Sequence, residues 1–254
     1  MLDLMFKLQQ EYGKGYLSYS SIKLALEDMQ KWEDKMRGMK FPETPALRFG
    51  KLHDCMVLTP EEFDSRYVVL DDSEILADIG GKAPRRTKAY TTWVDEQTIG
   101  GDLEIVTAEE YTTVQRMLLR LQTTGVYDEV LKGSKQEEFN DVFIGDVPVR
   151  GFLDVLGDGY ITDLKTTDSL SKFRYKVKDF GYDIQAYMYC EVFGVNTFHW
   201  VAQEKKEPYS VGWFTASEET LEWGKRKFNK AVRIICEYLE SGKACDSYFV
   251  RDTI

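Results

Sequence analysis

The residues best suited to chemistry lie in one short stretch, residues 151–167, with the sequence GFLDVLGDGYITDLKTT. Side chains alternate along a β-strand, so Asp163 and Lys165 project from the same face of the strand that contains them. The Gly-Asp-Gly segment at 157–159 is a strong hairpin signal between two apolar runs, and a hairpin folds Asp154 back toward Asp163. Two carboxylates and one ammonium group are therefore expected side by side at the end of apolar strands.

These charges have the composition of a site for a divalent cation. Burying carboxylates in apolar strands is costly unless a cation compensates them, and oxygen ligands favour Mg²⁺ or Mn²⁺ over zinc. A lysine beside metal-bound water can orient that water and offset charge that develops on a phosphate. The alternative interpretation is an exposed ion pair between Asp163 and Lys165, but the strongly apolar flanks of Asp154 and Asp163 favour the metal site.

Two further segments carry polar side chains at positions that could join this site. Gln185 and Tyr189 are four residues apart, so they share one face of an expected helix. His53, one of only two histidines in the chain, lies in the segment Gly50-Lys-Leu-His of an earlier expected helix. Taken alone, a tyrosine at helical spacing is typical of a core, and a lone histidine is typical of a buried, hydrogen-bonded residue.

The pattern of apolar and polar residues predicts the elements that must position these side chains. Helices are expected around 22–32 after a cap at Ser20 or Ser21, from Pro45 to 58, at 59–63, and from 107 to about 125. Strands are expected over 139–144, 147–156, 160–166, 197–204 and 209–215, with helices over 179–193 and 217–239. This order predicts an α/β fold in which helices flank a mixed central sheet and an N-terminal helical layer packs on it.

We expect residues 1–254 to form a single domain, with a mainly helical layer over 1–125 and a catalytic α/β core over 136–254. Between residues 71 and 102 the pattern weakens. Residues 80–90 contain the basic cluster of the first half of the chain, within Gly-Gly-Lys-Ala-Pro-Arg-Arg-Thr-Lys. The two glycines and the proline are typical of a loop.

Length and composition exclude several classes of protein. The 254 residues are 43% hydrophobic, enough for a sizeable core, yet no apolar run approaches the ~20 residues that span a bilayer. Four cysteines, at positions 55, 190, 236 and 245, are scattered without a C-x-x-C pair, which favours a reduced, cytoplasmic protein. The net charge of −10 argues against non-specific adhesion to DNA or acidic membranes, although a metal ion or a local basic patch can reverse the field at one place.

Together the quoted segments resemble the RecB/RecE branch of the PD-(D/E)XK nucleases. The shared pattern is, in order, Gly50-x-x-His53, Gly151-x-x-Asp154, Asp163-Leu-Lys165-Thr-Thr and Gln185-x-x-x-Tyr189. Two more segments are similar to phage- and prophage-type RecE-like exonucleases, namely Ser18-Tyr-Ser-Ser-Ile-Lys23 and Arg85-Arg-Thr-Lys88. The resemblance covers nearly the whole chain and implies a restriction-endonuclease-like core.

The resemblance implies a role for each matched residue. His53, Asp154 and Asp163 would bind Mg²⁺ or Mn²⁺ together with the backbone carbonyl of Leu164. Lys165 would position the attacking water and stabilise the transition state, while Gln185 and Tyr189 would orient Lys165 or contact the DNA backbone. Relatives often carry a further acid on the preceding strand, for which Glu138 or the adjacent Glu137 is the candidate. Some relatives hold an iron–sulfur cluster through four cysteines, but the scattered cysteines here predict none.

Two basic segments are candidates for DNA binding. The first, between residues 165 and 178, has a single acid, Asp168, and carries two interleaved aromatic residues, Phe173 and Tyr175. Its candidate contacts to phosphate are Lys172, Arg174, Lys176 and Lys178. The second segment supplies Arg85, Arg86 and Lys88. Either segment could follow phosphates and stack bases, or could be an ordinary solvated loop.

The function implied by the resemblance is a metal-dependent exodeoxyribonuclease that resects linear double-stranded DNA from 5′ to 3′ for recombination. The resemblance also implies a ring-shaped homo-oligomer on DNA ends, with a single-strand annealing protein as partner. An endonuclease and a single-strand-specific nuclease stay open, because the same residues serve all three. A DNA-binding module without activity also stays open, although the intact Asp154, Asp163 and Lys165 argue against it. The chain has no G-x-x-x-x-G-K-[ST] loop, H-E-x-x-H helix or G-x-S-x-G elbow.

Overall fold

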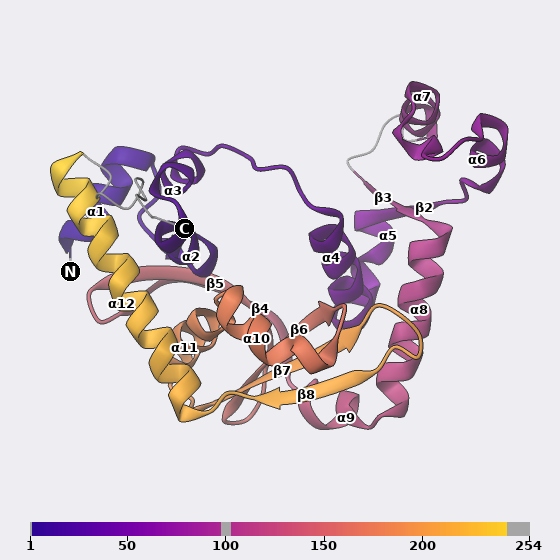
Figure 1. Cartoon of the computed structure of the whole chain (residues 1–254). Coiled ribbons are helices and arrows are strands. Elements are labelled where there is room, and N and C mark those ends of the chain that lie inside the picture. The colour runs from indigo at the N-terminus through magenta and orange to yellow at the C-terminus, as the bar shows by residue number, and fades with distance from the viewer. Residues whose placement is uncertain (1, 98–102, 243–254) are drawn as a thin grey trace, which may run out of the picture.

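A mixed sheet of six strands forms the centre of the protein (Figure 1). The computed structural model describes residues 2–97 and 103–242. The strands are β1 (Leu17–Ser18), β4 (Ser134–Ile144), β5 (Val147–Leu156), β6 (Tyr160–Thr167), β7 (Thr197–Glu204) and β8 (Val211–Thr215). Strands β4, β5 and β6 are antiparallel neighbours, β6 and β7 run parallel, β8 returns antiparallel to β7, and β1 pairs in parallel with β5. The expected mixed α/β fold is confirmed.

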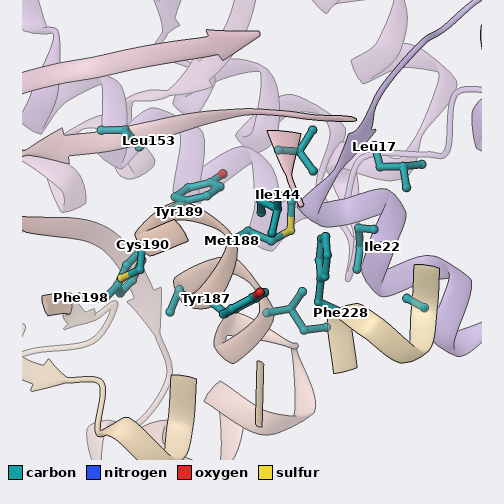
Figure 2. Packing of buried hydrophobic residues seen from close by; sticks show 14 of the residues in the cluster. Leu17, Ile22, Ile144, Leu153, Tyr187, Met188, Tyr189, Cys190, Phe198 and Phe228 are labelled. Atoms are coloured by element: carbon teal, nitrogen blue, oxygen red, sulfur yellow. The ribbon is translucent and has the colours of Figure 1, made fainter. Parts of the chain in front are cut away.

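Alternation of side chains along β7 divides the core into two layers. Phe198, Trp200 and Ala202 face a large cluster built with α1 (Leu2–Tyr12), α2 (Tyr19–Glu27), α3 (Met29–Met36), α10 (Phe173–Asp179), α11 (Tyr182–Phe193) and α12 (Glu218–Ser241), part of which is seen in Figure 2. Val201 faces the other way. There it packs with Leu164 of β6 and with α4 (Pro45–Leu58), α8 (Ala108–Thr123) and α9 (Val126–Val130). Helices therefore cover both faces of the sheet.

Helix α11 is the central helix of the larger layer, and every residue from 183 to 190 is buried. The helix expected over 179–193 is α11, which begins at Tyr182, and a further helix, α10, occupies the segment before it, where no helix was expected. They are separated at Gly181, which adopts a left-handed backbone conformation with φ of 69°. A glycine accepts that conformation without steric cost, so the chain can turn there before the helix begins again.

The N-terminal layer is confirmed as helical, but its helices begin elsewhere than expected. Ser18, rather than Ser20 or Ser21, caps α2, because its hydroxyl accepts the N–H of Ser21. Asp28 then accepts the N–H of Lys31 and starts α3. The single helix expected around 22–32 is therefore divided at Asp28.

A second, two-stranded sheet interrupts the helical first half of the chain, and the sequence pattern missed it. Parallel strands β2 (Tyr67–Leu70) and β3 (Glu104–Thr107) are preceded by a 3-10 turn (Pro60–Glu62) and α5 (Phe63–Arg66). Beyond them lie α6 (Ser73–Ile79) and α7 (Lys88–Gln97), away from the main sheet (Figure 1). The expected loop at 80–90 contains a 3-10 turn (Pro84–Arg86) and the start of α7.

No helix in the described part of the chain is long and apolar enough to cross a membrane. Cys55 and Cys190 are buried, and neither they nor Cys236 form a disulfide. Cys245, which entered the expectation of no iron–sulfur cluster, lies outside the described residues.

Candidate active site

The candidate site lies where β5 and β6 separate. Strand β5 pairs with β6 only at its last two residues and with β1 only near its start, so residues 151–154 have β4 as their one strand neighbour. The backbone groups freed in this gap need other partners. The Oδ2 atom of Asp154 accepts the N–H of Leu164 at 2.7 Å, and the Tyr189 hydroxyl donates to the carbonyl of Phe152 at 3.0 Å. Two side chains singled out in the sequence therefore fill the opening between the strands.

Asp163 and Lys165 project from the same face of β6, toward α11. Lys165 Nζ lies 2.5 Å from Oδ2 of Asp163, and Gln185 Nε2 donates to Oδ1 of Asp163 at 2.7 Å. The ammonium group also lies 5.1 Å from the ring centre of Tyr182, an aromatic residue that the sequence analysis did not single out. Both oxygens of Asp163 are thus held, one by a cation and one by an amide.

The electrostatics of the site are dominated by burial and by repulsion between carboxylates. Burial raises the pKa of Asp154 well above its ordinary value, and the charges of Asp163 and Asp54 raise it further. Burial also raises the pKa of Asp163, although the Lys165 ammonium opposes this. Burial would lower the pKa of Lys165, but the two carboxylates of β5 and β6 outweigh it and raise that pKa above its usual range.

Helix α4 contributes two consecutive side chains, His53 and Asp54. The His53 ring is fully buried, and its Nε2 lies 2.9 Å from Oε1 of Gln203 on β7. Its Nδ1 has no hydrogen-bond partner within the described chain and lies 3.8 Å from Oδ1 of Asp54. Sequence reasoning missed Asp54, whose charge acts on both Asp154 and Asp163. The sequence feature that could have identified Asp54 is its position as a single acid in the apolar second half of a helix.

The donor groups present fit a hard divalent cation. Asp154 and Asp163 share the Lys165 ammonium group, the charge of Asp54 acts on both of these carboxyls, and the Nδ1 atom of His53 is buried without a hydrogen-bond partner in the described part of the protein. The N–H of Leu164 points into the gap toward Asp154, and in an extended strand the carbonyl of a residue points the same way as its N–H. Carboxylate oxygens, a carbonyl and an imidazole suit Mg²⁺ or Mn²⁺. Within residues 2–97 and 103–242, no three His, Cys, Asp or Glu side chains already lie close enough together to hold a metal ion.

The two candidates for the additional acid lie on β4. Glu138 lies on β4 opposite Phe152 and is exposed, and Glu137 lies opposite Leu153 and is half-buried. Strand β5 stands between these two acids and β6. The ligand role of Glu138 therefore stays a prediction.

The first basic segment forms a 3-10 turn (Leu170–Lys172) and α10, directly after β6. Lys172, Arg174 and Lys178 are exposed there, and Tyr175 is 63% exposed. Lys176 instead donates to the hydroxyl of Thr167 at 2.8 Å. Three of the four basic side chains are thus presented to solvent beside the end of the strand that carries Lys165.

In the second basic segment, Arg85 is engaged within the protein. Its guanidinium donates to both carboxylate oxygens of Asp72, at 2.7 and 3.2 Å, and Tyr90 donates to the same carboxylate at 2.8 Å. This buried carboxylate ties the segment to the chain that precedes α6. Arg86 and Lys88 are exposed.

The fold and the grouping of Asp154, Asp163 and Lys165 define a domain of the PD-(D/E)XK nuclease type. Residues 18–247 match the model of one family, described as "PDDEXK-like domain of unknown function (DUF3799)". The chain belongs to this family, and the resemblance seen in the sequence is confirmed. No curated protein matches the chain.

Solved structures share the fold at low sequence identity. A "Putative exonuclease" from Eubacterium rectale is similar with a TM-score of 0.65 and 15% identity, covering 98% of this chain and 92% of that one. An alkaline exonuclease from Laribacter hongkongensis is similar with a TM-score of 0.34 and 13% identity, covering 76% of this chain and 100% of that one. The first of these likenesses supports the fold assignment.

Proposed function

We propose that the protein is a Mg²⁺- or Mn²⁺-dependent exodeoxyribonuclease that hydrolyses linear double-stranded DNA. The single observation that carries this proposal is the grouping of buried Asp163 with half-buried Asp154 and Lys165 at the opening between β5 and β6, in a chain of the PDDEXK-like family. Resection from 5′ to 3′, a ring-shaped homo-oligomer and a single-strand annealing partner remain part of the proposal on the resemblance alone.

The metal would be held by His53, Asp154, Asp163 and the carbonyl of Leu164. When bound, a divalent cation supplies a water of lowered pKa and offsets negative charge on the phosphate. The Gln185 amide fixes Oδ1 of Asp163 and so orients that carboxylate. Tyr189 holds the backbone of β5 apart from β6 through Phe152.

Lys165 performs the step that no other described side chain at the site is placed to perform. Its raised pKa keeps it charged at neutral pH, so it can hydrogen-bond the attacking water and the phosphate oxygens at once. As the water oxygen bonds to phosphorus and gives up a proton to solvent, the leaving P–O bond breaks and its oxygen takes up a proton from solvent. Negative charge grows on the phosphate oxygens in the transition state. A fixed ammonium group stabilises that charge more than it stabilises the ground state.

The DNA backbone would reach this site along α10. Lys172, Arg174 and Lys178 are exposed next to the end of β6, and phosphate binding by such a group is non-specific for sequence. Arg86 and Lys88 are the candidates from the second segment. Arg85 is a third candidate, although its guanidinium also forms an ion pair with Asp72.

The test is digestion of end-labelled linear duplex beside closed circular DNA, in Mg²⁺ or in EDTA. The enzymes compared are wild type, Lys165→Ala and the control Lys230→Ala, which changes an exposed lysine on α12. We expect metal-dependent loss of the linear substrate alone, unchanged in the control and absent in Lys165→Ala. Loss of a 5′ label before a 3′ label would indicate degradation from 5′ to 3′.

The other outcomes separate the alternatives. Cleavage of the circle would identify an endonuclease, and cleavage of single strands alone a single-strand-specific nuclease. DNA binding without cleavage of any substrate would identify an inactive binding module and would refute the proposed activity.

A further inference from the structure

Gln203 is a fully buried glutamine in the middle of the molecule, and its side-chain amide is completely hydrogen-bonded. Its Nε2 donates to the carbonyl of Met117 in α8 at 2.8 Å and to the carbonyl of Tyr209 at 3.2 Å. These two bonds use both amide protons, because carbonyl oxygens can only accept. The Oε1 atom is thereby left to face Nε2 of His53 at 2.9 Å.

This arrangement decides which nitrogen of His53 carries the proton. Oε1 of Gln203 has no proton to give, so Nε2 of His53 must be the donor. In the neutral imidazole, Nδ1 then carries the lone pair. In the other tautomer, the lone pairs of His53 Nε2 and Gln203 Oε1 would face each other. A rotation of the Gln203 amide would avoid this only by breaking both of its bonds to carbonyls.

The Nδ1 atom is buried, and the described residues give it no hydrogen bond. Oδ1 of Asp54, which is also an acceptor, lies 3.8 Å from it. The His53 ring is fully buried while the Asp54 side chain is 31% exposed, and a buried acceptor with neither a proton nor a cation beside it is unfavourable. This pair lies beside the carboxylates of Asp154 and Asp163, whose pKa values the Asp54 charge raises.

We propose that Gln203 is a positioning residue that locks His53 in the Nε2–H tautomer and so presents Nδ1 as a ligand for the divalent cation of the site. The proposal rests on the proposed metal-dependent function. It couples the metal site to α8 and to the β7–β8 connection, because Gln203 binds the backbone of both. Hydrogen-bond partners of ligand histidines commonly fix the tautomer in this way.

The first experiment reads the tautomer directly, in the full-length, metal-free protein. Histidine labelled with ¹⁵N gives only two imidazole groups, His53 and His199, and two-bond ¹⁵N–¹H spectra at pH 8 distinguish the protonated nitrogen. His199, whose Nδ1 lies 3.0 Å from the Thr215 hydroxyl, is the internal reference. Thr215→Val assigns the His199 signals because it removes that contact alone.

We expect the neutral Nε2–H form for His53. The Nδ1–H form, or a doubly protonated ring, would overturn the proposal even if every variant failed to fold. This reading needs neither metal nor DNA. A protein that lacks nuclease activity but shows the expected tautomer would therefore refute the proposed activity, while the role of Gln203 in fixing the His53 tautomer would still be supported.

The second experiment measures Mn²⁺ affinity by calorimetry, without DNA, for wild type, Gln203→Met and Gln203→Glu. The methionine variant keeps similar length but accepts no proton from His53, and we expect Mn²⁺ to bind about 10–100-fold more weakly, with mixed tautomers. The glutamate variant keeps an acceptor for the Nε2 proton but loses both amide bonds to the carbonyls of Met117 and Tyr209, so its affinity should lie above that of Gln203→Met. Circular dichroism checks that each variant is folded. A folded Gln203→Met with wild-type affinity would overturn the proposal.

Discussion

The ion pair between Lys165 and Asp163 gives the sharpest prediction about stability. We expect Lys165→Met to destabilise the metal-free protein by about 3 kcal/mol at pH 8. The Asp163 side chain is 3% exposed and the Lys165 side chain 20% exposed, and removing one partner of a buried pair costs ~3–5 kcal/mol. The lower end applies because Lys165 is partly solvated and Gln185 still holds Oδ1 of Asp163.

The loss should depend on pH in a defined direction. Burial already raises the pKa of Asp163, and the lysine opposes that shift, so the variant has a still higher folded-state pKa. A folded state that binds protons more tightly than the unfolded state loses stability as pH rises. The difference between variant and wild type should therefore shrink at pH 5.5 and grow toward pH 8.

Urea unfolding in EDTA measures the difference, and a thermal melt should show a fall of about 6–12 °C at pH 8. The double variant Lys165→Met/Asp163→Asn removes both charges and should recover most of the loss. Lys230→Met, on an exposed part of α12, should change stability by less than about 0.5 kcal/mol. A single variant as stable as wild type at pH 8, or a double variant no better than the single one, would refute the reasoning.

Three other perturbations test the packing, the charge balance and the DNA path. Gly224→Ala should lower the free energy of unfolding by about 1–3 kcal/mol in a thermal melt, because the new Cβ would lie 2.0 Å from a backbone oxygen of α11. Gly50→Ala should raise it by about 0.5–1 kcal/mol, because the nearest atom to its new Cβ lies at 3.9 Å. Asp54→Asn should lower the pKa of the neighbouring carboxyls, stabilise the metal-free protein at pH 8 more than at pH 5, and weaken Mn²⁺ binding in calorimetry. Lys172→Glu/Arg174→Glu should reduce DNA affinity in fluorescence anisotropy, and should reduce the slope of log K against log salt by about 1.8 if each residue meets one phosphate.

Matched variants decide whether these effects are specific. Asp158→Asn removes an exposed acid in the β5–β6 hairpin and should leave both Mn²⁺ affinity and stability unchanged. Lys225→Glu/Lys230→Glu makes the same charge change on exposed positions of α12 and should keep the salt slope. If a test variant and its matched variant had equal effects, the effect would come from the change in net charge and not from the position of the residue. A harmless Gly224→Ala would contradict the close packing of α11 against α12.

Much of the strand arrangement around the candidate site could be predicted from local sequence. The five strands from 139 to 215 were predicted within a few residues, because apolar runs bounded by glycine turns act over short distances. The common face of Asp163 and Lys165 follows from the two-residue period of a strand, and the common face of Gln185 and Tyr189 from the helical period. The family resemblance added the expectation that these separate segments form one site.

Other features depended on contacts between residues far apart in sequence. The opening between β5 and β6 exists because their pairing ends after two residue pairs, which the pattern of either strand does not reveal. Arg85 is a DNA-binding candidate in the sequence, and only the structure shows its ion pair with Asp72, which lies 13 residues earlier. The pairing of β2 with β3 joins segments more than 30 residues apart, on either side of a stretch without clear periodicity.

Local sequence was enough to predict which residue types could hold a metal and which faces of their strands and helices they occupy, because periodicity is a local property of the backbone. The influence of Asp54 on Asp154 and Asp163, and the contact of Gln203 with His53, 150 residues away, depend on tertiary contacts. Hydrogen bonds and charge repulsion act through space, and the fold sets which groups come within their range.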